Sequence, residues 1–211
     1  MDGSLLRLAW EAGAGRENLI RAGGLLLATA GFWSGRAAWP ASFGAALAAT
    51  SFAWTGHARL LTPAAAPFLL GVHLIGAAFW LGALTCLLVV AHDGDTSRLA
   101  HATARFGASA TYVVALMTAA ALSLLSMLLG GVAQLWSSDY GRIALVKVGF
   151  VAALLGLAAY NKLRLTPRLL AGDAVAASSL HVSVRLELLL GVLIVTVTAA
   201  LTTLAGPPVL D

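Results

Sequence analysis

The amino-acid sequence predicts an all-α fold: a polytopic membrane helix bundle of about six transmembrane helices, forming one domain over residues 1–211. Of the 211 residues, 60% are hydrophobic and 10% are charged, and the mean hydropathy is +0.89. A soluble domain has a charged fraction of about 25%, so this composition excludes that class. A membrane-spanning helix needs about 20 predominantly apolar residues. The expected spans are residues 18–34, 41–59, 67–91, 107–129, 143–161 and 186–204.

The first expected span contains the pair Gly23-Gly24. Adjacent glycines lower helix propensity but allow a neighbouring helix to approach closely. The preceding segment contains Asp2, Glu11 and Glu17 and has no continuous apolar region. We therefore expect no cleavable signal peptide, and we expect the first span to act as the insertion signal.

Two histidines flank the reversal between the second and third expected spans, which two prolines mark. By helical rise, His57 lies about 6 Å and His73 roughly 9 Å from the same membrane surface. Trp54 shares a helical face with His57, and Trp80 lies on the face that begins at His73. We therefore expect the two imidazoles at similar depth, with the tryptophans lining the site between them.

Met127 lies near the end of the fourth expected span, at the depth inferred for the two histidines. Neutral imidazoles bind copper, and a thioether is a soft ligand suited to Cu(I). A set of His57, His73 and Met127 would hold Cu(I) with two or three ligands. Two alternatives remain open: the histidines could hold haem, in a haem-binding protein or a haem-pathway oxidoreductase, or they could be structural in an accessory subunit.

The positive charges are distributed unequally between the two sides of the last four expected spans. Six lysines and arginines lie in or beside residues 91–106 and 162–185, whereas the opposite side has three. The positive-inside rule therefore predicts cytoplasmic loops at 91–106 and 162–185 and outer loops at 60–66 and 130–142. This topology explains the net charge of +4 without a nucleic-acid partner. Asp139, in an outer loop, is a candidate entry residue for a cation, and Lys147 is expected to snorkel outward.

Glu187 lies about one turn inside the last expected span, where a carboxylate is costly unless it has a partner. Asn161, Arg164 and Arg185 are the candidate partners, since all are expected at the same inner end of the last two helices. The cluster would form either a structural clasp or the inner end of an ion path.

An ordered set of motifs over about residues 47–203 resembles the bacterial copper resistance protein D family, as a short member without the amino-terminal helices of longer members. The set comprises Gly56-His57-Ala58, His73, Trp80-Leu81-Gly82, Tyr140-Gly141-Arg142, Lys147, Asn161, Pro167 and Glu187. The resemblance implies a multi-pass protein of the bacterial cytoplasmic membrane that imports copper and is not an enzyme. It also implies a small periplasmic copper-binding protein as the partner.

Overall fold

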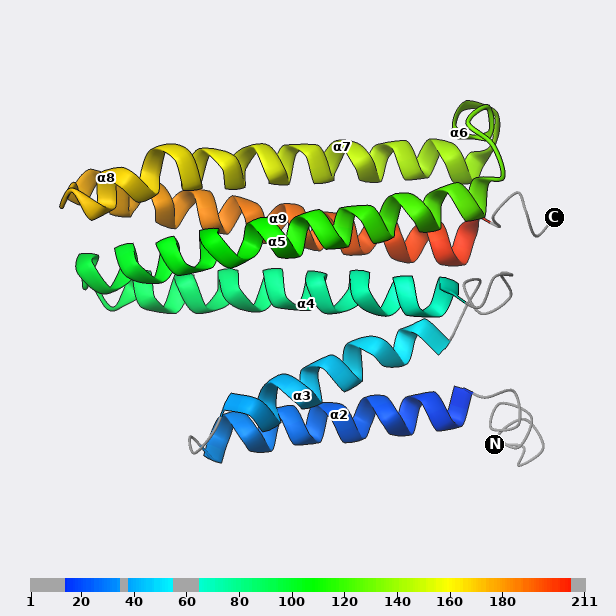
Figure 1. The fold of residues 1–211 in the computed structure, drawn as a ribbon, viewed down its shortest axis with the longest axis horizontal. Helices are drawn as coiled ribbons and strands as arrows, with labels where there is room; N and C mark the ends of the chain where they lie inside the picture. The colour runs from blue at the N-terminus through cyan, green and yellow to red at the C-terminus, as the bar shows by residue number, and fades with distance from the viewer. Residues whose placement is uncertain (1–13, 35–37, 55–64, 206–211) are drawn as a thin grey trace. The chain divides into compact units, whose positions relative to one another are not determined.

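The chain is almost entirely helical in the part described by a computed structural model, which covers residues 14–34, 38–54 and 65–205. Within those ranges there is no strand, and the predicted all-α class is confirmed. Among the described residues, four helical segments are long and apolar enough to cross a membrane, and they match the third to sixth expected spans (Figure 1). They are α4 (Ala65–His92), α5 (Thr96–Leu129), the continuous segment Asp139–Leu170 and α9 (Ala174–Leu204).

Shorter or less apolar helices occupy the positions of the first two expected spans. α2 covers Ala14–Ser34, and α3 (Ala38–Thr50) continues into the 3₁₀ turn η1 (Ser51–Trp54). Neither is among the four candidate spans, so the number of six stays a prediction. By their contacts, the residues group into two compact units, Met1–Ala78 with Leu116–Met127 and Phe79–Ala115 with Leu128–Asp211. The single domain also stays a prediction.

Two of the helices begin well before the expected spans. The Asp95 carboxylate accepts the backbone N–H of Arg98 at 2.9 Å and starts α5 at Thr96. Asp173 accepts the N–H of Val175 at 2.9 Å and starts α9 at Ala174. Side-chain caps of this kind satisfy the donors of a first helical turn. The segments 91–106 and 162–185, expected to be loops, are therefore largely helical, and each contains only a short turn.

In the first unit, α2 and α3 pack through glycines. A Cβ atom on Gly24 would lie 2.7 Å from the backbone nitrogen of Ala48, and one on Gly44 would lie 2.4 Å from that of Ala28. Any side chain at either position would therefore force the two helices apart. This observation agrees with the close packing expected at the glycine pair, although a Cβ atom on Gly23 itself would have no neighbour within 4 Å among the described residues.

In the second unit, residues from α4, α5, α9 and the segment Asp139–Leu170 build one apolar core. Leu84, Leu165 and Leu180 are almost completely buried in it. The Trp80 ring meets the Phe106 ring edge-on, with 5.4 Å between the centroids. Within this unit, the turns at 93–95 and 171–173 lie at one end of the helices, and α6 (Gln134–Ser137) lies at the other (Figure 1). This alternation agrees with the expected topology.

The segment Asp139–Leu170 is not a uniform α-helix. A π-helical turn, η3 (Asn161–Leu165), separates α7 (Asp139–Tyr160) from α8 (Thr166–Leu170). The Thr166 hydroxyl donates to the Asn161 carbonyl oxygen at 2.9 Å, and the Thr166 backbone N–H bonds the same oxygen. Such turns are rare and occur frequently at functional sites.

Candidate functional site

His73 makes a hydrogen bond between two candidate spans. It lies about 12 Å along α4 from Ala65 by helical rise, and its Nδ1 is 3.2 Å from the carbonyl oxygen of Met117 on α5. A carbonyl oxygen can only accept, so Nδ1 donates, and the lone pair of the neutral ring is on Nε2. Metal-binding histidines commonly donate their second ring nitrogen to a backbone carbonyl in this way. The local geometry therefore suits a metal ligand.

The Met117 side chain packs one helical turn from His73, against Gly76. A Cβ atom on Gly76 would lie 3.2 Å from the Met117 sulfur and 3.1 Å from its Cβ. Met127 is about 15 Å further along α5 by helical rise. The structure therefore brings Met117, and not Met127, to the level of His73. The sequence did not reveal this, because it does not determine the relative positions of α4 and α5 along their axes.

The structure does not test whether the remaining members of the expected copper site lie beside His73. His57 lies outside the described residues, as does the side chain of Trp54. Trp80 belongs to the second unit, where its side chain is buried. Over the part of the chain that the structure describes, no group of three or more His, Cys, Asp and Glu side chains could hold a metal ion.

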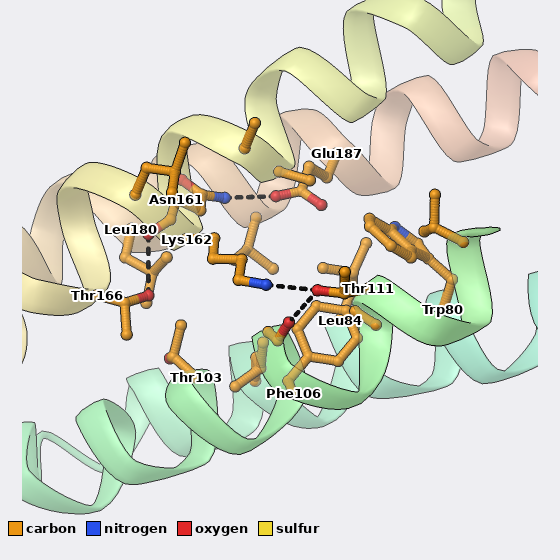
Figure 2. Close-up of a pocket in the computed structure, with 18 residues that line it drawn as sticks. Trp80, Leu84, Thr103, Phe106, Thr111, Asn161, Lys162, Thr166, Leu180 and Glu187 are labelled. Carbon is orange, nitrogen blue, oxygen red and sulfur yellow. Dashed lines mark hydrogen bonds between the residues drawn. The ribbon is translucent and has the colours of Figure 1, made fainter.

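A cavity of about 300 Å³ lies inside the second unit (Figure 2). Glu187 of α9, with 1% of its surface exposed, and Asn161, with 6%, line it. The Asn161 amide donates from Nδ2 to Oε1 of Glu187 (Figure 2). Of the three partners expected for this carboxyl group, the structure therefore pairs it with the amide. Arg164 and Arg185 are exposed, and Arg185 borders a different, shallow pocket.

Four buried polar atoms in this region have no hydrogen-bond partner among the described residues. They are Trp80 Nε1, Asn161 Oδ1, Ser183 Oγ and Glu187 Oε2. Trp80, Asn161 and Glu187 all line the cavity, and in Figure 2 the carboxyl group lies between the amide and the indole ring. Buried polar atoms normally have partners, since leaving one unpaired costs about 1–3 kcal/mol. Such a concentration is typical of a site that receives water or a ligand.

Residues 100–201 match the family model of copper resistance protein D. This segment is similar to that family. The match includes Met117, Asn161 and Glu187 and begins after His57 and His73. No curated protein and no solved structure matches the chain. The described part of the chain thus combines four helices that are long and apolar enough to cross a membrane with a segment similar to a copper resistance protein.

The copper resistance protein D segment contributes two charged side chains to the cavity lining, Glu187 and Lys162. Lys162 is exposed, and its ammonium group donates to the Thr111 hydroxyl (Figure 2). The hydroxyl in turn donates to the carbonyl oxygen of Gly107 at 2.9 Å. The expectation of a polar partner for Glu187 identified one end of this cavity, but it did not predict that Lys162 and Trp80 line the same cavity.

Asp139 and Lys147, also in the matched segment, are not part of this cavity. Asp139 is exposed, and its Oδ1 lies 3.6 Å from the Nη1 of Arg142. An exposed ion pair such as that of Asp139 with Arg142 contributes little to stability. Lys147 is half-buried within α7. The proposed roles of Asp139 in cation entry and of Lys147 at the interface stay predictions.

Proposed function

We propose that this chain imports copper across the bacterial cytoplasmic membrane, receiving it from a small periplasmic copper-binding protein. The family match connects the chain with copper, and four apolar helices make a membrane location the natural one. The direction of transport and the partner rest on the likeness to the copper resistance protein D family. Copper is the cargo in this proposal, and the chain is a carrier and not an enzyme.

One observation carries the proposal: the hydrogen bond between His73 Nδ1 and the Met117 carbonyl oxygen. It fixes the imidazole in the form whose other nitrogen can bind Cu(I), and it brings a thioether to the same level. We infer an entry site containing His73, with His57 as a second ligand. Met117 supplies the thioether in preference to Met127, because Met117 packs one turn from His73.

The orientation follows from the unequal distribution of positive charge. The turns at 93–95 and 171–173 face the cytoplasm, because six lysines and arginines lie in or beside these connections. α4 ends at His92, beside one of these turns, so its start at Ala65 faces the periplasm. His73 then lies in the periplasmic half. Single cysteines at Ser97, Gly172 and Ser137, in a Cys86→Ser background, test this with an impermeant thiol reagent: only the last should react in intact cells.

Anaerobic titration with Cu(I) and a competing chromogenic chelator tests the entry site directly. We expect the purified wild type to bind about one Cu(I) per chain and His73→Ala to bind it at least about tenfold more weakly, since a ligand is lost. His101→Ala is the matched control, because His101 Nδ1 also bonds a backbone carbonyl, that of Ser97, but on an exposed surface. Equal losses in the two variants would reject His73 as a specific ligand.

The two methionines provide a second matched pair. Methionine-to-leucine changes keep the side-chain volume and remove the sulfur. We expect Met117→Leu to weaken Cu(I) binding about tenfold and Met127→Leu to leave it unchanged, because a soft thioether contributes only where it reaches the metal. The reverse result would restore Met127 as the ligand. An intense haem absorption band in the wild type, lost in His73→Ala, would replace copper with haem.

A further inference from the structure

We propose that Glu187 and Asn161 form a proton-binding site in the cavity of the second unit, and that copper movement is coupled to proton movement through it. The coupling rests on the proposed copper transport. The proton site itself rests only on the geometry of the second unit, so the two parts can fail separately.

The position of Glu187 within α9 is the first reason for the proposal. It is almost completely buried and lies about 20 Å from Ala174 and about 26 Å from Leu204 by helical rise. A carboxylate so completely buried is costly without a cation or a proton. Among the described residues, no lysine or arginine forms an ion pair with it. A proton on the carboxyl group removes the charge without any further partner.

The surroundings of Glu187 favour a proton over a metal cation. Oε1 accepts from the Asn161 amide, whereas Oε2 has no partner in the described chain. A proton on Oε2 turns that atom into a donor. A hard metal cation needs about six oxygen ligands, but the unpartnered oxygens here are only those of Glu187, Asn161 and Ser183. The fourth unpartnered atom, Trp80 Nε1, is a donor and repels a cation.

The cavity provides room for the water that proton exchange requires. Its volume of about 300 Å³ exceeds the roughly 30 Å³ that one water molecule occupies in the liquid. Water in it can donate to Glu187 and Asn161 and accept from Trp80. Apart from Glu187 itself, Lys162 is the charged side chain among the described residues that line the cavity. The other lining residues from α4, α5 and α9 are uncharged. Lys162 is exposed and bonds Thr111, so it lies at the open side of the cavity.

The arrangement differs from that expected of a purely structural clasp. A clasp satisfies its own hydrogen bonds, because a partly satisfied buried network is less favourable than an apolar core. Here both members of the pair retain an unpartnered atom that is buried beside a cavity. Asn161 also begins the π-helical turn, a feature that occurs frequently at functional sites. These observations together indicate exchange with a mobile ligand.

Infrared difference spectroscopy of the purified protein between acidic and alkaline pH tests the proton site without copper. We expect a protonated-carboxyl band that disappears in Glu187→Gln, which keeps the shape of the side chain. Asp139→Asn, which removes an exposed carboxylate, is the control and should retain the band. The proposal is overturned if Glu187→Gln keeps the band. It is also overturned if sodium chloride, compared with choline chloride at constant pH, displaces the proton, since the site then belongs to a metal cation.

Copper uptake into vesicles containing a pH indicator tests the coupling. We expect the wild type to move protons together with copper and to respond to an imposed pH gradient. Glu187→Gln should move copper without either effect. If the variant keeps both effects, the coupling is wrong. If wild-type vesicles take up no copper while the infrared band is present, the transport proposal and its coupling fail, whereas the proton site stands.

Discussion

His73 in the first unit and Glu187 in the second are both polar side chains within helices long enough to cross a membrane, but their surroundings differ. His73 bonds a backbone carbonyl, and the neighbouring Gly76 leaves no space before the Met117 side chain. Glu187 bonds a side-chain amide and lies beside a cavity with unpartnered atoms. The first arrangement fixes one ring in one orientation. The second leaves room for something to enter and leave.

The contrast indicates that a polar residue in a membrane helix can serve two different purposes. A side chain held by a backbone carbonyl is preorganised, because the acceptor belongs to a rigid helix. A side chain beside unsatisfied groups retains a need for partners, which water or a ligand can meet. Substitutions should therefore have different consequences in the two regions.

The largest expected effect is that of Glu187→Ala. The change leaves the Asn161 amide without its acceptor and enlarges the cavity, so we expect the free energy of unfolding in detergent to fall by about 1–3 kcal/mol or more. Glu187→Gln keeps an oxygen acceptor and should cost clearly less. Thermal unfolding of both variants measures the difference. Equal losses would mean that the hydrogen bond with Asn161 contributes nothing to stability.

The next largest effect is expected from adding a larger side chain in each of the two regions, which differ in free space. Gly76→Leu places atoms where the Met117 side chain already lies, and overpacking of this kind costs about 1–3 kcal/mol. Ala110→Leu adds the larger side chain at a residue that lines the cavity, so its cost should stay below about 1 kcal/mol. The same thermal measurement applies. A greater loss for Ala110→Leu would show that the cavity is not available space.

A smaller effect is expected from the histidine hydrogen bonds. His73→Leu removes a bond between two helices, worth about 0.5–1.5 kcal/mol. His101→Leu removes a bond to Ser97 within the same helix, from an exposed ring, and should change stability by less than about 0.5 kcal/mol. If the two variants are equally stable, the interhelical bond does not fix His73.

The smallest effect concerns a carboxylate outside the spans, in contrast with Glu187. Hydrogen bonds from the Arg168 guanidinium hold the pKa of Asp173 below its usual range, and the N–H groups of Val175 and Ala176 lower it further. Because the pKa is lower in the folded state, the stabilisation is present above the unfolded value of about 3.9 and is lost as the pH falls through the folded value.

Asp173→Asn should therefore accelerate hydrogen exchange slightly in the first turn of α9 at neutral pH. The difference from the wild type should vanish in strong acid, where both side chains are uncharged. Asp93→Asn is a suitable comparison, since Asp93 forms only an exposed pair with Arg98. A difference between wild type and Asp173→Asn that persists in strong acid would attribute the effect to capping geometry instead of charge.

Composition and apolar windows predicted the fold class, the membrane location and the position of four spans. They underestimated the lengths of α5 and α9, because hydropathy detects the apolar part of a helix and not its polar continuation. Asp95 and Asp173, which start those helices, are of a residue type favoured at helix N-caps, a signal that the prediction did not use. Helix starts and membrane boundaries are therefore separate predictions.

The candidate sites were predicted less completely. The cost of burying Glu187 indicated a polar partner, and Asn161 was among the three residues considered. The proximity of Met117 to His73 depends on how far α4 and α5 are shifted along each other, and apolar helices carry little information about that shift. The pair His57 and His73 stays a prediction, because His57 lies outside the described residues.

The π-helical turn at Asn161–Leu165 makes this part of the chain unusually tolerant of a change of length. Its hydrogen bond spans five residues, whereas that of an α turn spans four. Deleting Leu163 would remove the surplus residue and let the wide turn close into a regular α turn, while α7 and α8 keep nearly the same orientation. The span would remain just as apolar, but the Asn161 carbonyl oxygen would lose the bond that now spans five residues. Relatives that share the Asn161–Glu187 pair should therefore include chains that lack one residue at this turn.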